Sequence, residues 1–334
     1  MSHRRPPDCC RGYIGSMIQP RRSLVFLADN KSPLPQRIGG FLFAAFLVGV
    51  ATHAWAQGVN LFPPPGADDS GEREMKALAQ AYPDRISRAE QRNGDWTVDV
   101  QGDWFFWAHG RILPESQRSD WARYGRFRFY PYPLGGLPPL PQLDAETAGR
   151  LKQALAQARV HPPRRSENFL ERLYQAATRT QTDSQIVTVS FLGFPVRVHQ
   201  RIAEPLTRVA AECAALRLKD PEVGAFFRGI TEIDGFNYRD VAGTATRSYH
   251  SYGLALDFIP RSYGGKAPYW RWVMSRTVDW WTTPYDQRWM IPLSVVAAFE
   301  KEDFVWGGKW LFFDTMHFEY RPEIFLLAKE KPAP

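Results

Sequence analysis

SYHSYGLALDF, residues 248–258, places a histidine seven positions ahead of an aspartate. On one unbroken strand this odd separation would point His250 and Asp257 to opposite faces. A bend is therefore required between them, and Gly253 can supply it because glycine adopts conformations that other residues avoid. After the bend, alternate apolar side chains can enter a core, while the small Ala255 leaves room beside the Asp257 carboxylate for an ion.

A second stretch, DTMHFE at residues 314–319, supplies another histidine. Apolar residues alternate with His317 there, which predicts a strand that presents the imidazole on one face. With His250 and Asp257 the chain then offers two imidazoles and one carboxylate to a metal ion. Three protein ligands leave the fourth position of a tetrahedral zinc ion open, as in catalytic sites. We therefore expect a catalytic Zn²⁺ site.

Asp314 stands three residues before His317, at the beginning of the predicted strand. We expect it to lie close to the metal without binding it. A carboxylate in that position can take a proton from the attacking water and pass it to the leaving amine. Of the seven histidines in the chain, His109 and His199 are the alternatives if one of the expected ligands is wrong.

The first 56 residues have the parts of a leader that directs export of the protein. An apolar run at 41–51 follows Arg37 and ends near Ala54-Trp55-Ala56, as in a secretory signal peptide. The run is too short to span a bilayer, which takes about 20 residues. We expect cleavage after Ala56 and a periplasmic or cell-envelope location. The alternative is a leader retained as a membrane anchor, which would be the chain's only membrane contact.

The charge balance argues against a nucleic-acid partner. Residues 1–56 contain seven basic and two acidic residues, so they carry most of the net charge of +7. The remaining 35 basic and 33 acidic residues nearly cancel, so the net charge gives no electrostatic case for binding a phosphate backbone. Beyond the leader Cys213 is the sole cysteine, so the mature chain has no intrachain disulfide.

Residues 57–185 form an accessory region whose role the sequence does not reveal. Its patterns predict a helix at 72–82, a strand pair at 95–112 turned at Gly102-Asp103, a stiff proline-rich connection at 131–143, and helices near 145–159 and 166–179.

Residues 186–328 form the expected catalytic domain. Its patterns predict a strand pair at 186–198 turned at Gly193, a helix at 201–218, strands within 229–241, 254–259 and 304–320, and a helix near 292–302. Because strands and helices are mixed without regular alternation, we predict an α+β fold rather than a parallel α/β sheet.

The pattern Ser-x-His-x-x-Gly-x-Ala-x-Asp at 248–257 is followed by FVWGGKW at 304–310 and by Asp-x-x-His-Phe-Glu at 314–319. Together these motifs closely resemble the zinc D-alanyl-D-alanine carboxypeptidase and L-alanyl-D-glutamate endopeptidase family, which includes phage endolysins and vancomycin-resistance peptidases. The resemblance covers roughly residues 186–328. It implies a mixed sheet with packed helices, in the α+β fold shared with the Hedgehog signalling domain.

The resemblance also implies roles for single residues. The three zinc ligands would be His250, Asp257 and His317, and the acid/base would be Asp314. Arg239 would stabilise the developing oxyanion or hold a substrate carboxylate, as a planar guanidinium can. The alternative role for Arg239 is a salt bridge on the protein surface. Ser248 and Glu319 would hold the site residues in position rather than take part in the reaction.

The function that follows is hydrolysis of peptide bonds in peptidoglycan stem peptides. Whether the terminal D-alanine or the L-Ala–D-Glu bond is cut stays open. One alternative is a non-catalytic cell-wall or peptide-binding module on the same fold, and another is an enzyme for a different peptide or amide. Residues 261–291, an aromatic-rich stretch that departs from the family's usual pattern, can wall the cleft and alter substrate preference.

Overall fold

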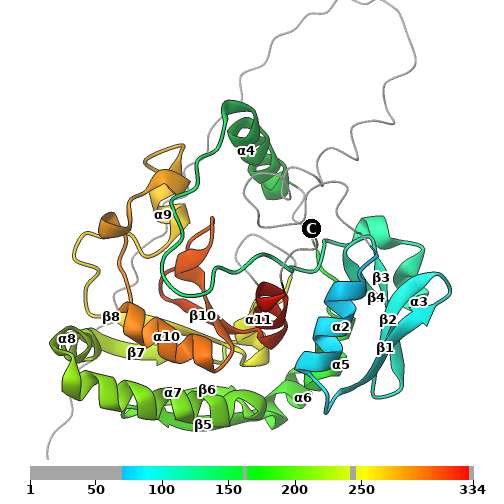
Figure 1. Cartoon of the computed structure of the whole chain (residues 1–334), viewed down its shortest axis with the longest axis horizontal. Coiled ribbons are helices and arrows are strands. Elements are labelled where there is room, and N and C mark those ends of the chain that lie inside the picture. The colour runs from blue at the N-terminus through cyan, green and yellow to red at the C-terminus, as the bar shows by residue number, and fades with distance from the viewer. Residues whose placement is uncertain (1–69, 161–163, 241–245, 331–334) are drawn as a thin grey trace, which may run out of the picture. The chain divides into compact units, whose positions relative to one another are not determined.

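Three antiparallel sheets and the helices around them make up an α+β fold, as predicted (Figure 1). The computed structural model describes residues 70–160, 164–240 and 246–330. The expected signal peptide and cleavage site lie outside these residues. Within them, no helix combines the length and the apolar character that a membrane span requires.

The accessory region begins with a helix and a four-stranded antiparallel meander. These are α2 (Glu72–Ala81), β1 (Ile86–Arg92), β2 (Asp95–Val100), β3 (Asp103–Ala108) and β4 (Arg111–Pro114). The predicted strand pair is thus only part of a larger sheet. Its turn lies at Gln101-Gly102 rather than at Gly102-Asp103. Gln101 and Gly102 both adopt positive φ, at 53° and 94°, as the central residues of such a turn do. Such a two-residue turn matches the twist of the strands that it joins.

The rest of the accessory region is mostly helical or extended. Short helices α3 (Glu115–Arg118) and η1 (Trp121–Arg123) precede the proline-rich connection, and α4 (Ala145–Val160), α5 (Asn168–Tyr174) and α6 (Arg179–Ser184) follow it. The single helix predicted at 166–179 is wrong, because α5 ends where Gln175 takes a left-handed conformation. A capping box between Thr178 and Gln181 then starts α6.

The C-terminal part opens with the predicted hairpin and helix. Its first elements are β5 (Ile186–Phe191), β6 (Phe194–His199), α7 (Gln200–Lys219) and α8 (Pro221–Gly229). The second four-stranded sheet has the order β7-β8-β10-β9. Its strands are β7 (Ile230–Asp234), β8 (Ala255–Pro260), β9 (Phe304–Trp306) and β10 (His317–Tyr320). The strand-like run at 304–320 is therefore two paired strands with a loop between them.

Short elements surround this sheet. They are η2 (Tyr249–Tyr252), α9 (Trp270–Met274), η3 (Trp280–Thr282), η4 (Tyr285–Gln287), α10 (Leu293–Lys301), η5 (Gly307–Lys309) and α11 (Pro322–Lys329). Helix α10 matches the helix predicted near 292–302. The aromatic side chains of 261–291 do not line one continuous wall, since Trp280 and Trp281 are buried in a small core with Trp270.

One apolar core joins the accessory region to the C-terminal part. It includes Met75 of α2 together with Phe191 and Phe258. Helix α2 packs against α11 (Figure 1). The buried Tyr82 hydroxyl, just past the end of α2, also donates a hydrogen bond to Glu323 at 2.9 Å. The boundary expected near residue 185 stays a prediction, but the parts on either side of it are packed against each other.

His199 caps α7 as a neutral imidazole. Its Nδ1 accepts the backbone N–H of Arg201 at 3.0 Å, so Nε2 carries the hydrogen and donates to the Tyr174 carbonyl at 3.0 Å. Burial lowers the pKa of His199 to about 4. Both ring nitrogens of His199 are therefore used in hydrogen bonds that stabilise the fold, and His199 is not a metal ligand in this structure.

We expect His199 to make folding stability fall at acid pH. Its folded pKa lies below the unfolded value of about 6.5, so its stabilising contribution is full above pH 6.5 and is lost as the pH falls toward 4. Denaturant unfolding should show a loss of about 2 kcal/mol from this group between pH 7.5 and pH 5. The His199→Asn variant should lack that component, and an unchanged pH dependence in the variant would contradict the prediction.

Candidate metal centre

Two neighbouring strands and one turn bring the three expected ligands together. Strands β8 and β10 pair antiparallel, with His317 directly opposite Asp257. The turn η2 adds His250 from just before β8. One ligand atom from each residue lies within 4.8 Å of the others. The structure therefore gathers residues that are up to 67 positions apart in the sequence.

The turn that carries His250 depends on a serine and a glycine. The Ser248 hydroxyl accepts the backbone N–H of His250 at 3.3 Å, which caps η2. Gly253 ends η2 with φ at 69°, in the left-handed region. A Cβ there would also lie 2.6 Å from the backbone nitrogen of His199. Glycine is thus required both for conformation and for space, and the bend expected from the sequence occurs at this residue.

The Asp257 carboxylate lies between the two imidazoles. Its Oδ2 is 3.2 Å from His250 Nε2, and its Oδ1 is 2.8 Å from His317 Nδ1. The two ring nitrogens are 3.3 Å apart. Two nitrogens and a carboxylate oxygen thus converge on one point, and this is a donor set that zinc accepts.

The other nitrogen of each imidazole is held by an acceptor. His250 Nδ1 donates to the Gly235 carbonyl at 2.6 Å, and His317 Nε2 donates to Glu319 at 3.1 Å. Such contacts set the tautomer of a metal-binding histidine and orient its ring. They leave His250 Nε2 and His317 Nδ1 as the atoms available to a metal, so the residues present fit a zinc ion.

The charges around His317 favour a bound cation. Burial alone would raise the pKa of Asp257, but the charges of His250 and His317 lower it. Burial alone would lower the pKa of His317, but the carboxylates of Asp257 and Glu319 raise it well above its ordinary value. The same two carboxylates can therefore stabilise a metal ion in place of a proton on the imidazole.

The role of Glu319 in orienting His317 is tested by replacing Glu319 and measuring the zinc affinity. Because its carboxylate orients His317, Glu319→Ala should weaken zinc binding by about 100-fold and Glu319→Gln by about tenfold. Competition with a chromophoric zinc chelator measures both constants. Glu302→Gln makes the same change at a residue that pairs with Arg208 instead, and should leave the affinity unaltered. An unchanged zinc Kd in Glu319→Ala would show that Glu319 does not support the ligand.

Asp314 lies beside the cluster with a largely buried carboxylate. Burial raises its pKa to about 7, an effect that the Asp257 charge strengthens and the His317 charge opposes. Its backbone N–H donates to the Gly307 carbonyl at 3.0 Å. Its Oδ1 is buried without a hydrogen-bond partner among the described residues. Its backbone carbonyl accepts the His317 N–H at 3.3 Å, so Asp314 lies next to one expected ligand, and its role as the acid/base stays a prediction.

The structure places Arg239 beside the turn that carries His250. The Arg239 N–H donates to the Ser251 hydroxyl at 2.7 Å, and its carbonyl accepts from the Ser248 N–H at 3.1 Å. Its side chain is exposed. Within the described ranges, no hydrogen bond or ion pair reaches its guanidinium, so it forms no surface salt bridge there. Its role in the reaction stays a prediction.

The sequence reasoning missed a buried arginine behind the site. Arg321 is 1% exposed, and its guanidinium lies 3.5 Å from Glu319 and also pairs with Glu323. Burial in this position would lower its pKa, but nearby groups that include Glu323 and Glu319 raise it. No motif singled it out, because Arg321 follows the recognised motif at 314–319 and stands at the junction of β10 and α11.

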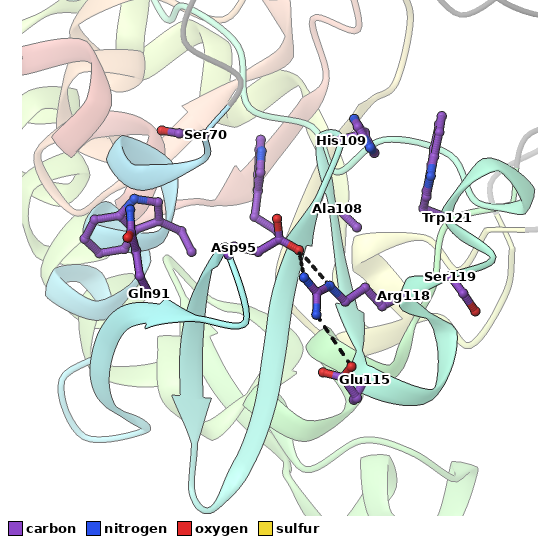
Figure 2. Close-up of a pocket in the computed structure, with 12 residues that line it drawn as sticks. Ser70, Gln91, Asp95, Ala108, His109, Glu115, Arg118, Ser119 and Trp121 are labelled. Carbon is purple, nitrogen blue, oxygen red and sulfur yellow. Dashed lines mark hydrogen bonds and ion pairs between the residues drawn. The ribbon is translucent and has the colours of Figure 1, made fainter.

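A separate pocket of about 580 Å³ lies on the accessory sheet (Figure 2). Its walls include aromatic, polar and charged side chains, namely Gln91, Asp95, Trp96, Trp107, His109, Arg118 and Trp121. Arg118 crosses it, 2.5 Å from Asp95 and 3.6 Å from Glu115. None of the expected metal ligands lines this pocket, and His109, an alternative ligand, belongs to it rather than to the cluster.

Comparison with known protein families agrees with this geometry. Residues 242–320 match a family model described as D-alanyl-D-alanine carboxypeptidase, and residues 74–129 match a domain of unknown function. The first match contains the three expected ligands and Asp314, which supports a peptidase assignment for this part of the chain. No curated protein and no solved structure matches the chain.

Proposed function

We propose that the protein is an exported zinc metallopeptidase that hydrolyses peptide bonds in peptidoglycan stem peptides. The proposal depends above all on the convergence of His250, Asp257 and His317 beside the buried carboxylate of Asp314. Their position within the segment that matches the carboxypeptidase family supports it. Export is proposed from the leader-like pattern of residues 1–56.

Zinc held by three protein ligands would supply Lewis-acid polarisation of a carbonyl and a water molecule of lowered pKa. The Asp314 carboxylate would accept a proton as water adds to the scissile carbonyl carbon. It would then give that proton to the amine as the C–N bond breaks, so the products are a carboxylate and an amine. Gly235 and Glu319 keep the imidazoles oriented throughout, and the exposed Arg239 would stabilise the developing oxyanion.

The substrate is tested by digesting purified muropeptides with the zinc-loaded protein and identifying the products by mass spectrometry. Release of terminal D-alanine or cleavage between L-alanine and D-glutamate would support the proposal and show which bond is cut. Folded, zinc-loaded protein that cleaves neither bond would contradict it. Binding of intact muropeptides without cleavage would favour a non-catalytic module on the same fold.

A further inference from the structure

The pocket on the accessory sheet runs across the ends of neighbouring strands (Figure 2). Gln91 lines it near the end of β1, and Asp95 and Trp96 line it at the beginning of β2. Trp107 follows from the end of β3, and Trp121 from η1. Because β1, β2 and β3 are adjacent in the sheet and strands lie about 4.8 Å apart, the pocket extends over about 10 Å. This length and the volume of about 580 Å³ suit a linear ligand made of several small units.

Tryptophans give the pocket an aromatic lining, and their neighbours hold the rings in place. The ammonium group of Lys76 lies 4.9 Å from the centre of the Trp96 ring. The guanidinium of Arg111 lies 5.0 Å from the centre of the Trp121 ring. Trp107 is packed into the core and is 8% exposed. Because these rings are already fixed, a ligand that stacks on them costs little side-chain entropy.

The charged groups in the pocket are already paired with one another. Arg118 Nε donates to Asp95 Oδ2 at 2.7 Å, and Arg118 Nη2 donates to the Asn93 carbonyl at 2.7 Å. Arg118 also lies 3.6 Å from Glu115, so it joins both carboxylates across the pocket (Figure 2). No other arginine and no lysine is among the described residues that line the pocket. An anionic ligand would meet two carboxylates there, and a cationic ligand would meet a guanidinium, so the lining suits an uncharged ligand.

The polar groups of the pocket both donate and accept hydrogen bonds. The exposed side chains of Gln91 and Ser119 offer an amide and a hydroxyl, and the carboxylates of Asp95 and Glu115 offer further acceptors. The pocket crosses strand ends, so it lacks the row of edge-strand backbone groups that an extended peptide pairs with. A sugar ring matches this lining, because it has C–H groups on its faces and hydroxyl groups around its rim.

We propose that this pocket binds neutral sugar rings of a glycan strand. The C–H groups of the sugar stack on the tryptophan rings, whose faces carry partial negative charge. Hydroxyl and acetamido groups bond to Gln91 and to the paired carboxylates. The identification of this strand as the glycan of peptidoglycan rests on the proposed function, whereas the binding of a neutral sugar does not. The site gives a role to the segment at 74–129, which matches a domain of unknown function, and it would hold the enzyme close to its peptide substrates.

The test is calorimetry of the whole zinc-loaded chain with chitotetraose, a neutral chain of N-acetylglucosamine. Trp121→Ala should raise Kd by at least about tenfold, and Trp121→Phe should raise it less because a ring is kept. Gln91→Ala, at an exposed residue whose replacement spares the core, should raise Kd by about threefold. Trp104→Ala is the matched control, because Trp104 lies on β3 outside the pocket, and it should leave Kd unchanged. Absence of binding by the wild type, or an unaltered Kd in both Trp121→Ala and Gln91→Ala, would overturn the proposal.

Co-sedimentation with purified peptidoglycan sacculi connects this site to the polymer. The wild-type protein should sediment with sacculi, and chitotetraose should release it. Trp121→Ala protein should sediment less. If the wild type cleaves neither bond in muropeptides, the proposed function fails, while the Kd for chitotetraose still decides whether the pocket binds sugar. Release by a free stem peptide together with no release by chitotetraose would overturn the assignment of the pocket to the glycan.

Discussion

Asp314→Asn is expected to lower kcat for peptide hydrolysis by about 10²- to 10⁴-fold while zinc stays bound. The amide preserves the shape of the carboxylate but cannot accept the proton of the attacking water. Because Asp314 is not among the three expected ligands, zinc content should remain near one per chain. Steady-state kinetics and zinc analysis by mass spectrometry on the same preparation give both quantities.

A matched change elsewhere shows whether the loss is specific to this carboxylate. Asp279→Asn makes the same substitution at an exposed residue that pairs with Lys152, and it should leave kcat unchanged. If Asp314→Asn kept full activity, another group would have to transfer the proton. If it lost zinc together with activity, Asp314 would act as a ligand instead.

The second large effect is expected from removal of a ligand. Asp257→Ala or His317→Ala should reduce zinc content from about one per chain toward zero, because two remaining ligands hold the ion weakly. Loss of the Lewis acid removes several kcal/mol of transition-state stabilisation, so activity should fall by at least about 10³-fold. Zinc analysis and peptide hydrolysis measure the two effects, with circular dichroism as the check on folding.

His109→Asn provides the control for both ligand variants. His109 has a positive φ of 50° in a turn of the accessory sheet, a conformation that asparagine also adopts. Its replacement should therefore leave the fold, the zinc content and the activity intact. Zinc retained at full occupancy in both ligand variants would place the metal elsewhere in the chain.

Sequence reasoning was most successful where the decisive contacts are local. Helix α7 was expected at 201–218 and runs over Gln200–Lys219, because its apolar residues recur at helical spacing. The bend at Gly253 could likewise be expected from the odd separation of His250 and Asp257. The pairing of β8 with β10 then brings His317 opposite Asp257.

The accessory region was harder to predict because its signals are weaker. Strand β1 carries mainly polar residues and is largely exposed, so it shows little apolar alternation. The turn at Gln101-Gly102 depends on positive φ rather than on hydrophobicity. Thr178 and Gln181 did carry a capping-box signal that would have divided the helix predicted at 166–179.

The contact between Arg128 and Arg321 could not be expected from any pattern. These residues are 193 positions apart, and the contact is made by the backbone carbonyl of Arg128, which is common to all residue types. It depends on how the accessory region packs against α11 and β10. Such a contact is visible only once the fold is known.

The central claim is that His250, Asp257 and His317 together hold one zinc ion. Anomalous X-ray scattering at the zinc absorption edge, from crystals of the zinc-loaded protein, tests it most directly. The account predicts a single strong peak about 2.0–2.1 Å from His250 Nε2 and His317 Nδ1, with an Asp257 oxygen as the third protein ligand. A peak at other residues, or none at this cluster in fully loaded crystals, would contradict it.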